Sequence, residues 1–253
     1  MSIRTATSNG VTTLEIARPE KKNALTLAMY EAMAQALNTA LADKAVRAVL
    51  IVGQPNVFTA GNDLQDFMQQ PPTGEDSPVA QFMHALLNFD KPVVAAVTGA
   101  AVGIGVTMLL HCDLVYVSDD AQLSMPFVSL GLVPEFASSL VLPRLLGHVK
   151  AAEMLLLGSG FTGSDAVKLG IANAALPATE VVAHARRTAE RFNSLPAGAV
   201  RDAKRLMRAG SKDEITQAMR AEAAIFVERL RSPEAKEAFE AFFQKRKPDF
   251  AKL

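Results

Sequence analysis

The segment KPVVAAVTGAAVGIG (residues 91–105) carries the pattern that decides the expected fold. Its first half is a short, continuous apolar run, which is typical of a strand buried on both faces of a parallel sheet. Small residues follow, and a helix is predicted to begin near Gly103. A buried strand that passes through glycines into a helix is a building unit of α/β proteins.

The rest of the chain repeats this alternation, so we expect an α/β fold with largely parallel strands. One helix is predicted from an apolar stripe between Leu27 and Leu41, with Thr26 as its N-cap. Further strands are expected at residues 11–17, 46–52 and 113–117, and a loop at residues 69–78.

The pattern changes after Asn193, where strand-like runs stop and three helical stretches follow. We therefore divide the chain into a core at residues 1–193 and a C-terminal helical region at residues 194–253. That region ends in FFQKRKPDF (residues 242–250), where aromatic and basic residues lie side by side. A solvated, basic helix terminus accounts for this composition as well as a binding role does.

Charge and cysteine content exclude several classes of partner. Lys plus Arg equals Asp plus Glu at 26 each, so no overall basic field favours nucleic acid or an anionic membrane. The first ten residues contain no apolar run, and Cys112 is the single cysteine among 253 residues. We expect a cytoplasmic protein that binds neither nucleic acid nor membrane.

Several familiar catalytic motifs are absent from the sequence. There is no G-x-S-x-G, no Walker A loop and no H-E-x-x-H, and the four histidines lie in unrelated contexts, so no metal site is expected. GIGVTM (residues 103–108) begins like a dinucleotide fingerprint, but Met108 occupies the third glycine position. A dehydrogenase is therefore disfavoured.

Two glycine loops are candidates for binding an oxyanion. The helix that begins near Gly103 leaves unpaired backbone N–H groups at a positive helix end. Residues 60–62, Ala-Gly-Asn, interrupt a buried-strand pattern just before another helix and free a further N–H. Close helix packing explains the first loop equally well, and a glycine turn with a helix cap explains the second.

Glu135 is the only charged residue between Asp120 and Arg144, in the stretch LVPEFASSL (residues 132–140). An acid in an apolar surround has a raised pKa and is suited to proton transfer. A glutamate just after a proline is also common in the first turn of a helix, where it stays in solvent and favours the dipole. The residues alone leave both interpretations open.

Taken together, five segments resemble the crotonase, or enoyl-CoA hydratase/isomerase, superfamily over nearly the whole chain. They occur in the family's order: residues 18–26 (RPEKKNALT), 58–64 (FTAGNDL), 91–105, 112–135 and the terminal KRKPDF. The resemblance implies a spiral of ββα units with a helical C-terminal oligomerisation region. It also implies an acyl-CoA substrate and a homotrimer or a dimer of trimers.

The resemblance also implies the catalytic groups. The backbone N–H groups of Asn62 and Ile104 form an oxyanion hole on the thioester carbonyl, where each donor stabilises developing charge by about 3 kcal/mol. Hydratases of the family carry two glutamates at positions where this chain has Thr107 and Phe127. Glu135 matches the glutamate of peroxisomal 3-enoyl-CoA to 2-enoyl-CoA isomerases, as a single base that shuttles a proton from C2 to C4.

Coenzyme A enters only as part of the substrate, and no separate cofactor is expected. By resemblance, adenine lies by the loop of Ala60 and Leu64, and the backbone near Lys22 and Ala24 lines the pantetheine. Phe242 and Lys245 reach the nucleotide from a neighbouring subunit. Phe67, Met68, Phe82 and Leu86 are candidates for lining the acyl end, and they fit the hydrophobic core equally well.

Two other functions remain open besides the isomerase. One is enoyl-CoA hydration, or another crotonase-type enolate reaction. The other is non-catalytic binding of acyl-CoA.

Overall fold

Two sheets form the core of the computed structural model, which describes residues 2–71 and 74–253. The larger sheet has the strand order β1-β2-β3-β5-β7-β10, and its neighbours are parallel except for the hairpin of β1 and β2. Its strands are β1 (Ile3–Ser8), β2 (Val11–Ile16), β3 (Ala48–Val52), β5 (Val93–Val97), β7 (Leu114–Ser118) and β10 (Ala174–Leu176).

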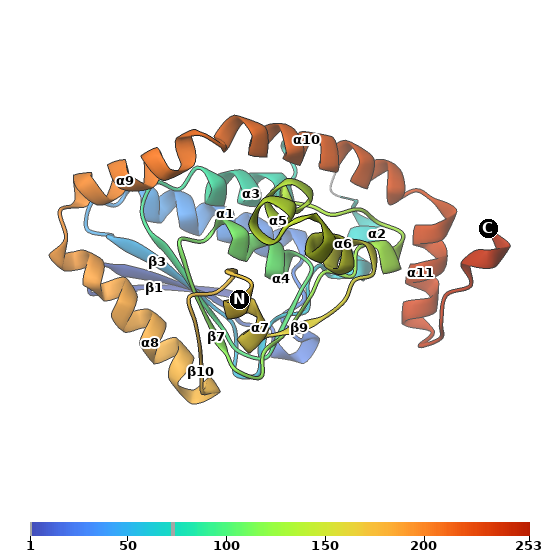
Figure 1. Cartoon of the computed structure of the whole chain (residues 1–253), viewed down its shortest axis with the longest axis horizontal. Coiled ribbons are helices and arrows are strands. Elements are labelled where there is room, and N and C mark those ends of the chain that lie inside the picture. Colours follow the sequence, from blue (N-terminus) through green and yellow to red (C-terminus); the bar gives the residue numbers. More distant parts are fainter. Residues whose placement is uncertain (1, 72–73) are drawn as a thin grey trace.

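The continuous apolar runs in the sequence arise because the large sheet is covered on both faces. In β3, Val49 and Ile51 enter the main core, whereas Ala48 and Leu50 contact the other face. Helix α8 (Ala178–Glu190) packs on that second face (Figure 1). Successive side chains of a strand point to opposite faces, so both must be apolar here.

A smaller sheet lies beside the first and has the order β4-β6-β8-β9. Its first three strands are parallel, and β9 pairs antiparallel with β8. All four strands are two or three residues long: β4 (Val57–Thr59), β6 (Ala100–Val102), β8 (Gln122–Ser124) and β9 (Phe161–Thr162). This sheet matters for the site because the loops after β4 and β6 lie next to each other.

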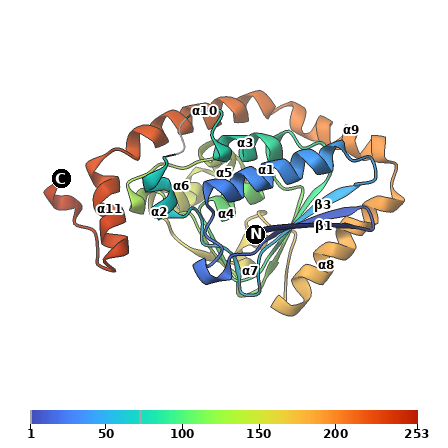
Figure 2. The same ribbon diagram turned by 180° about the vertical axis from the view of Figure 1, so that it is seen from behind.

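Helices α1 and α3 pack against each other on the main-core side (Figure 2). The helices of the core are α1 (Leu27–Ala42), α2 (Leu64–Gln69), α3 (Pro78–Leu87), α4 (Ile104–Thr107), α5 (Ser138–Leu146), α6 (His148–Leu156) and α7 (Gly163–Lys168). Short 3-10 turns are η1 (Pro19–Lys21), η2 (Met108–His111), η3 (Val128–Leu130) and η4 (Arg191–Ser194).

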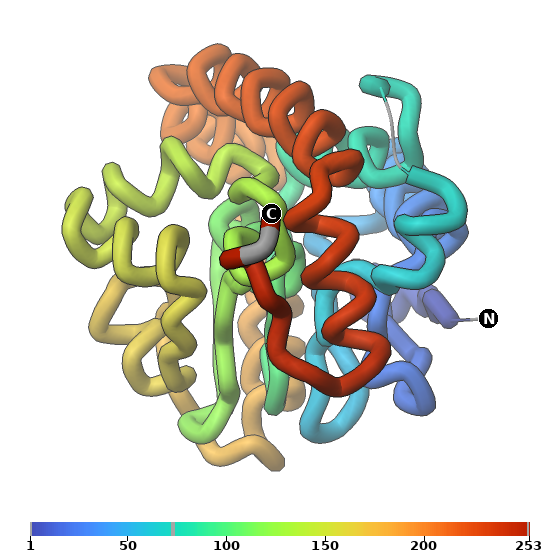
Figure 3. Tube along the Cα trace, turned by 90° about the vertical axis from the view of Figure 1, so that its right-hand side faces the viewer, coloured from blue at the N-terminus to red at the C-terminus, as the bar shows by residue number. Residues whose placement is uncertain are grey.

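The C-terminal region consists of α9 (Ala197–Ala209), α10 (Lys212–Arg229) and α11 (Pro233–Phe243), followed by the turn η5 (Phe250–Lys252). Helix α10 passes over the molecule and contacts α5, and α11 lies at one end of the molecule (Figures 1 and 3). Helix α11 packs on η3, where a Cβ on Gly131 would lie 2.6 Å from the backbone nitrogen of Ala235.

The α/β class and its spiral family fold are confirmed, as are the predicted strands, the capped helix α1 and the three terminal helices. The strand β1, the strand β10 and the small sheet were not predicted. The division at residue 193 stays a prediction. Residues 72 and 73 of the loop expected at 69–78 lie outside the described residues. None of the described helices is long and apolar enough to cross a membrane.

Candidate active site

The two glycine loops of the sequence follow β4 and β6, which are parallel neighbours. The carboxyl ends of parallel strands meet at one edge of a sheet, so the two loops lie together. Gly61 has φ +89°, and an added Cβ would lie 3.0 Å from the carbonyl oxygen of Val102. Gly103 has φ +56° and ψ −116°, which glycine adopts without strain.

Each loop presents a backbone amide without a protein partner. Among the residues that the structure describes, no acceptor is bonded to the N–H of Asn62 or of Ile104. Ile104 is the first residue of α4, so its N–H has no partner within the helix. The side chain of Asn62 accepts a hydrogen bond from the hydroxyl of Tyr30, which fixes its loop from α1. Both amides are free to bind an oxyanion.

Two of the segments predicted to hold coenzyme A, around Lys22 and around Ala60, lie side by side in the structure. The amide of Ala60 donates to the carbonyl of Lys22 at 3.0 Å, and Leu25 exchanges hydrogen bonds of 2.8 Å with Gly61 and Asp63. Leu64 begins α2 directly after its cap, Asp63. The structure therefore brings Lys22, Ala24, Ala60 and Leu64 together beside the free amide of Asn62, and their contact with the nucleotide stays a prediction.

Sequence reasoning missed the residue that ties these segments together, Asn23. It is fully buried, and its side chain donates to the carbonyl oxygens of Ile16, Val57 and Phe58. Its own carbonyl accepts a 2.7 Å hydrogen bond from the hydroxyl of Thr59. The only signal in the sequence was its place in RPEKKNALT, between the two lysines and the predicted helix.

The two positions that carry glutamate in hydratases of the family lie in the same region. Thr107 is fully buried in α4, and its hydroxyl oxygen has no hydrogen-bond partner among the described residues. The ring of Phe127 approaches the loop of Gly103, because an added Cβ on Gly103 would lie 3.7 Å from that ring. Neither side chain can accept a proton as a carboxylate does.

Glu135 is buried, with 7% of its surface exposed, and it precedes α5 rather than forming part of its first turn. The interpretation as a solvated helix residue is therefore wrong. Its Oε1 has no hydrogen-bond partner in the described part of the chain. Burial, and secondarily the charge of Glu222, raises its pKa to about 8. Burial and the charge of Glu135 likewise raise the pKa of Tyr30 well above its usual value.

The loop after Glu135 has an unusual backbone that two side chains hold. Phe136 and Ala137 have φ angles of +58° and +56°, which residues other than glycine seldom adopt. The ring of His111 stacks on Phe136 at 3.9 Å, and its Nε2 lies 2.7 Å from the Phe136 carbonyl oxygen. Burial lowers the pKa of His111 to about 4, so it is neutral at pH 7. Glu222 of α10 binds the other end of the loop.

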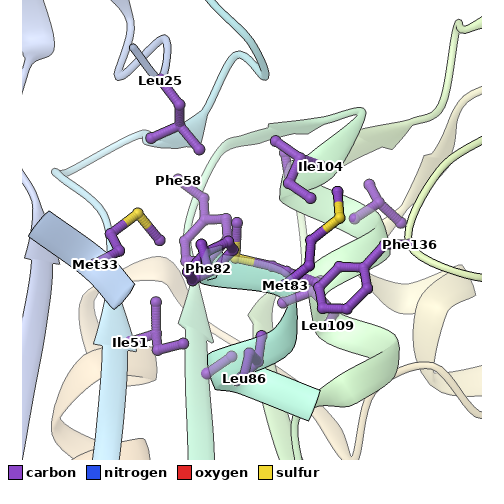
Figure 4. Packing of buried hydrophobic residues seen from close by; sticks show 14 of the residues in the cluster. Leu25, Met33, Ile51, Phe58, Phe82, Met83, Leu86, Ile104, Leu109 and Phe136 are labelled. Carbon is purple, nitrogen blue, oxygen red and sulfur yellow. The ribbon is translucent and has the colours of Figure 1, made fainter. Parts of the chain in front are cut away.

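Glu135 faces a cavity of about 460 Å³ between α3 and α10. Figure 4 shows Met83 and Phe136 together beside Ile104, at one side of the buried cluster. Of the side chains predicted to line the acyl end, Phe67 lines this cavity, Phe82 and Leu86 are buried without lining it, and Met68 is half exposed. The lining also includes Val79, Met83, Met219 and Phe226, which the sequence did not assign to the acyl end.

Phe242 and Lys245 lie at the end of α11 and are exposed. Within the described residues, no hydrogen bond or ring contact joins them to the loops of Lys22 and Ala60. Their reach to a nucleotide in a neighbouring subunit remains a prediction. A larger groove of about 1030 Å³ beside α9 contains none of the predicted site residues, and the charges along it are mostly paired.

An α/β scaffold that holds a buried carboxylate in the wall of an apolar cavity, and two free backbone amides on neighbouring loops, is suited to acid–base chemistry on a carbonyl compound. The family model "Enoyl-CoA hydratase/isomerase" matches residues 6–252. The chain belongs to the enoyl-CoA hydratase/isomerase family, whose members bind acyl-CoA thioesters.

Curated relatives carry both names of the family. The chain is 34% identical to "Enoyl-CoA delta isomerase 2" of Rattus norvegicus over 84% of its length, but it spans only 56% of that protein. It is 31% identical to "Probable enoyl-CoA hydratase" of Bacillus subtilis, with 98% of both chains covered. Sequence similarity therefore supports the family and leaves the reaction open between these two names.

Solved structures match the whole fold. The structure of Pseudomonas aeruginosa OdaA is 57% identical, covers 95% of this chain and 98% of its own, and has a TM-score of 0.94. An enoyl-CoA hydratase/isomerase from Pseudoalteromonas atlantica is 40% identical, covers 99% of this chain and 100% of its own, and has a TM-score of 0.93.

Proposed function

We propose that this protein is an acyl-CoA isomerase that moves the double bond of a 3-enoyl thioester to the 2-position. The observation that carries the proposal is the buried, partly unpartnered carboxylate of Glu135 in a wall of the cavity, with no carboxylate at positions 107 and 127. A shift of a double bond needs one base that takes a proton and returns it. Hydration by the family's usual mechanism needs two carboxylates around a water molecule.

The chemistry requires only the groups described. The carboxylate of Glu135 removes a proton from C2, and the electron pair of that C–H bond is delocalised onto the thioester oxygen as a dienolate. The amides of Asn62 and Ile104 stabilise this charge. Glu135, now protonated, returns the proton to C4, and the double bond forms between C2 and C3. A raised pKa suits both steps, because the group is a stronger base and still releases its proton.

Two parts of the site bind the two ends of the substrate. The apolar cavity between α3 and α10 takes the acyl chain, and its volume of about 460 Å³ lies within the usual range for ligand sites. The hydrogen-bonded segments around Lys22 and Ala60 adjoin the free amide of Asn62, and they bind the pantetheine and the adenine. Coenzyme A is then part of the substrate, and no further cofactor is needed for this reaction.

Hydration is the second candidate, because relatives of similar identity bear the name hydratase. Purified protein should be assayed side by side on a medium-chain 3-enoyl-CoA and a 2-enoyl-CoA, with chromatographic separation of the products. Migration of the double bond without 3-hydroxyacyl-CoA is the expected result. Efficient hydration would overturn the proposal, since it would require an acid and a base other than residues 107 and 127.

A further inference from the structure

A second buried acid, Glu222, contributes to the wall of the cavity that Glu135 faces. It lies on α10, 87 residues further along the chain, and is 7% exposed. The proposed reaction does not use it, and no motif in the sequence indicated it. A buried carboxylate is costly unless donors compensate for its lost hydration, so its partners indicate its role.

All the hydrogen bonds of Glu222 go to the segment that follows the base. Its Oε2 accepts from the amide of Ala137 at 2.6 Å, and its Oε1 accepts from the amide of Ser139 at 2.9 Å and from the Ser139 hydroxyl. Two oxygens that both accept from N–H groups are suited to a carboxylate, because it has no hydrogen to place toward either donor.

The segment that Glu222 binds is also the one with the strained backbone. Phe136 and Ala137 both have positive φ angles, and such residues persist only where their surroundings hold them. The amide of Ala137 points at Glu222 because of this conformation. Relaxation of Phe136 to an ordinary φ angle would turn the preceding peptide and move the side chain of Glu135.

We infer that Glu222 is a positioning residue for the base: its carboxylate holds residues 136–139 in the conformation that presents Glu135 to the cavity. This inference deepens the proposed function and rests on it where turnover is the readout. It assigns the C-terminal helix α10 a part in the reaction, beyond covering the core.

The charges around Glu135 are few, so the effect of Glu222 on its protonation is separable. Tyr30 faces it from α1, neutral His111 lies behind Phe136, and His84 of α3 lines the same cavity. Arg220 and Glu75, also of the lining, form a pair with each other at 2.9 Å and are exposed. Glu222 is therefore the buried carboxylate whose removal should most favour ionisation of Glu135.

The decisive variant is Glu222→Gln, which has the same shape but one accepting oxygen. Its amide group would oppose one of the two backbone donors, so the segment loses an anchor. We expect kcat on a 3-enoyl-CoA to fall by about 100-fold with little change in KM, as for a misplacement of about 1 Å. The acidic limb of the pH profile should move to lower pH, because a negative charge has been removed. Glu214→Gln on the exposed side of α10 is the matched control and should match the wild type.

Glu222→Asp separates position from charge. Aspartate keeps the negative charge, but its side chain is one methylene shorter and reaches the segment less well. We therefore expect kcat to fall while the acidic limb of the pH profile stays in place. If Glu222→Gln does not fold, Glu222→Asp and Ser139→Ala carry the test, and both should lose turnover. Unchanged kcat in these variants, or a loss without any movement of the acidic limb in a folded Glu222→Gln, would overturn the inference.

A crystal structure of Glu222→Gln distinguishes this inference from the proposed function. If the wild type turns over no 3-enoyl-CoA, the proposed function fails, but the conformation of residues 135–139 still tests the positioning role. The expected result is a changed φ at Phe136 or Ala137 and a displaced Glu135 carboxyl group. An unchanged segment would contradict the role.

Discussion

The chemistry of Glu135 at the scale of the residue follows from where the chain buries it. The residue is buried, its Oε1 has no partner in the described structure, and burial raises its pKa to about 8. Below that pH the group is mostly a neutral acid, and above it the carboxylate can act as a base. Burial of this single carboxyl group therefore sets the pH above which it can act as a base.

We predict that kcat/KM for a 3-enoyl-CoA rises with pH and levels off above about pH 8, because only ionised Glu135 removes the proton at C2. The measurement is a pH–rate profile of the wild type. An acidic limb near pH 4.5, the ordinary value for a glutamate, would contradict the assignment of Glu135 as the base.

The same pKa predicts how stability depends on pH. The pKa is higher in the folded state than in the unfolded state, so the folded protein holds the proton more tightly. The stabilisation is fully present below about pH 4.5 and is lost as the pH rises through about 8. The melting temperature of Glu135→Gln should therefore exceed that of the wild type by an amount that grows between these two pH values.

Gly103 is the second residue from which a prediction follows. Its φ of +56° and ψ of −116° direct the amide of Ile104, and space for a Cβ exists beside Phe127 at 3.7 Å. Gly103→Ala should therefore fold but turn the oxyanion donor away, lowering kcat by about 100-fold. Gly198→Ala, at a helical position with open space, is the control and should retain activity. Equal rates in the two variants would exclude this loop from the site.

How far the site could be predicted differs between its residues. Glycines drew attention to the loops of Asn62 and Ile104, and an isolated charge to Glu135, but the roles of these residues came from the family resemblance and stay predictions. Glu222 was not, because a glutamate on a polar-looking helix carries no signal until the fold places it against Ala137. Asn23 was missed for the same reason, since two of its three acceptors, Val57 and Phe58, lie in β4, far along the chain.

Elements were predictable where their burial produces a long pattern. Strands β3 and β5 are apolar on both faces and were found, as was α1 with its Thr26 cap. Strand β1 was missed because all its residues but Ile3 are exposed, which leaves no alternation. The strands of the small sheet are too short for any periodicity, although β4 and β6 position both glycine loops.

At the scale of elements, the cavity between α3 and α10 predicts selection by acyl-chain length. Val79→Phe should fill part of the cavity and lower kcat/KM for longer 3-enoyl-CoA chains more than for short ones. Val149→Phe is the control, because Val149 is 82% exposed on α6. Kinetics on a series of chain lengths check this, and equal effects on all chains would place the acyl group elsewhere.

At the scale of the whole molecule, the C-terminal region exposes several large apolar side chains. Leu206 and Met207 on α9 and Phe242 and Phe243 on α11 are exposed in a single chain. The family resemblance predicts a trimer or a dimer of trimers, with Phe242 and Lys245 reaching the nucleotide of a neighbouring subunit. Assembly and nucleotide contact both stay predictions.

Lys245→Ala tests the nucleotide contact at this scale. Loss of one ammonium group from a phosphate should weaken binding of a saturated acyl-CoA by about threefold to tenfold, and binding should become less sensitive to salt. Lys236→Ala, an exposed lysine on α11, the helix that precedes Lys245, is the control and should bind normally. Calorimetry at two salt concentrations measures both effects. Identical affinities for the two variants would remove Lys245 from the site.

The central claim is that one carboxylate moves the double bond, and Glu135→Gln tests it most directly. The amide has nearly the same shape but cannot accept the proton. We predict that kcat on a 3-enoyl-CoA falls by about 10²–10⁴-fold, the usual contribution of a general base, while affinity for a saturated acyl-CoA is nearly unchanged. Turnover by Glu135→Gln at the wild-type rate would contradict the account.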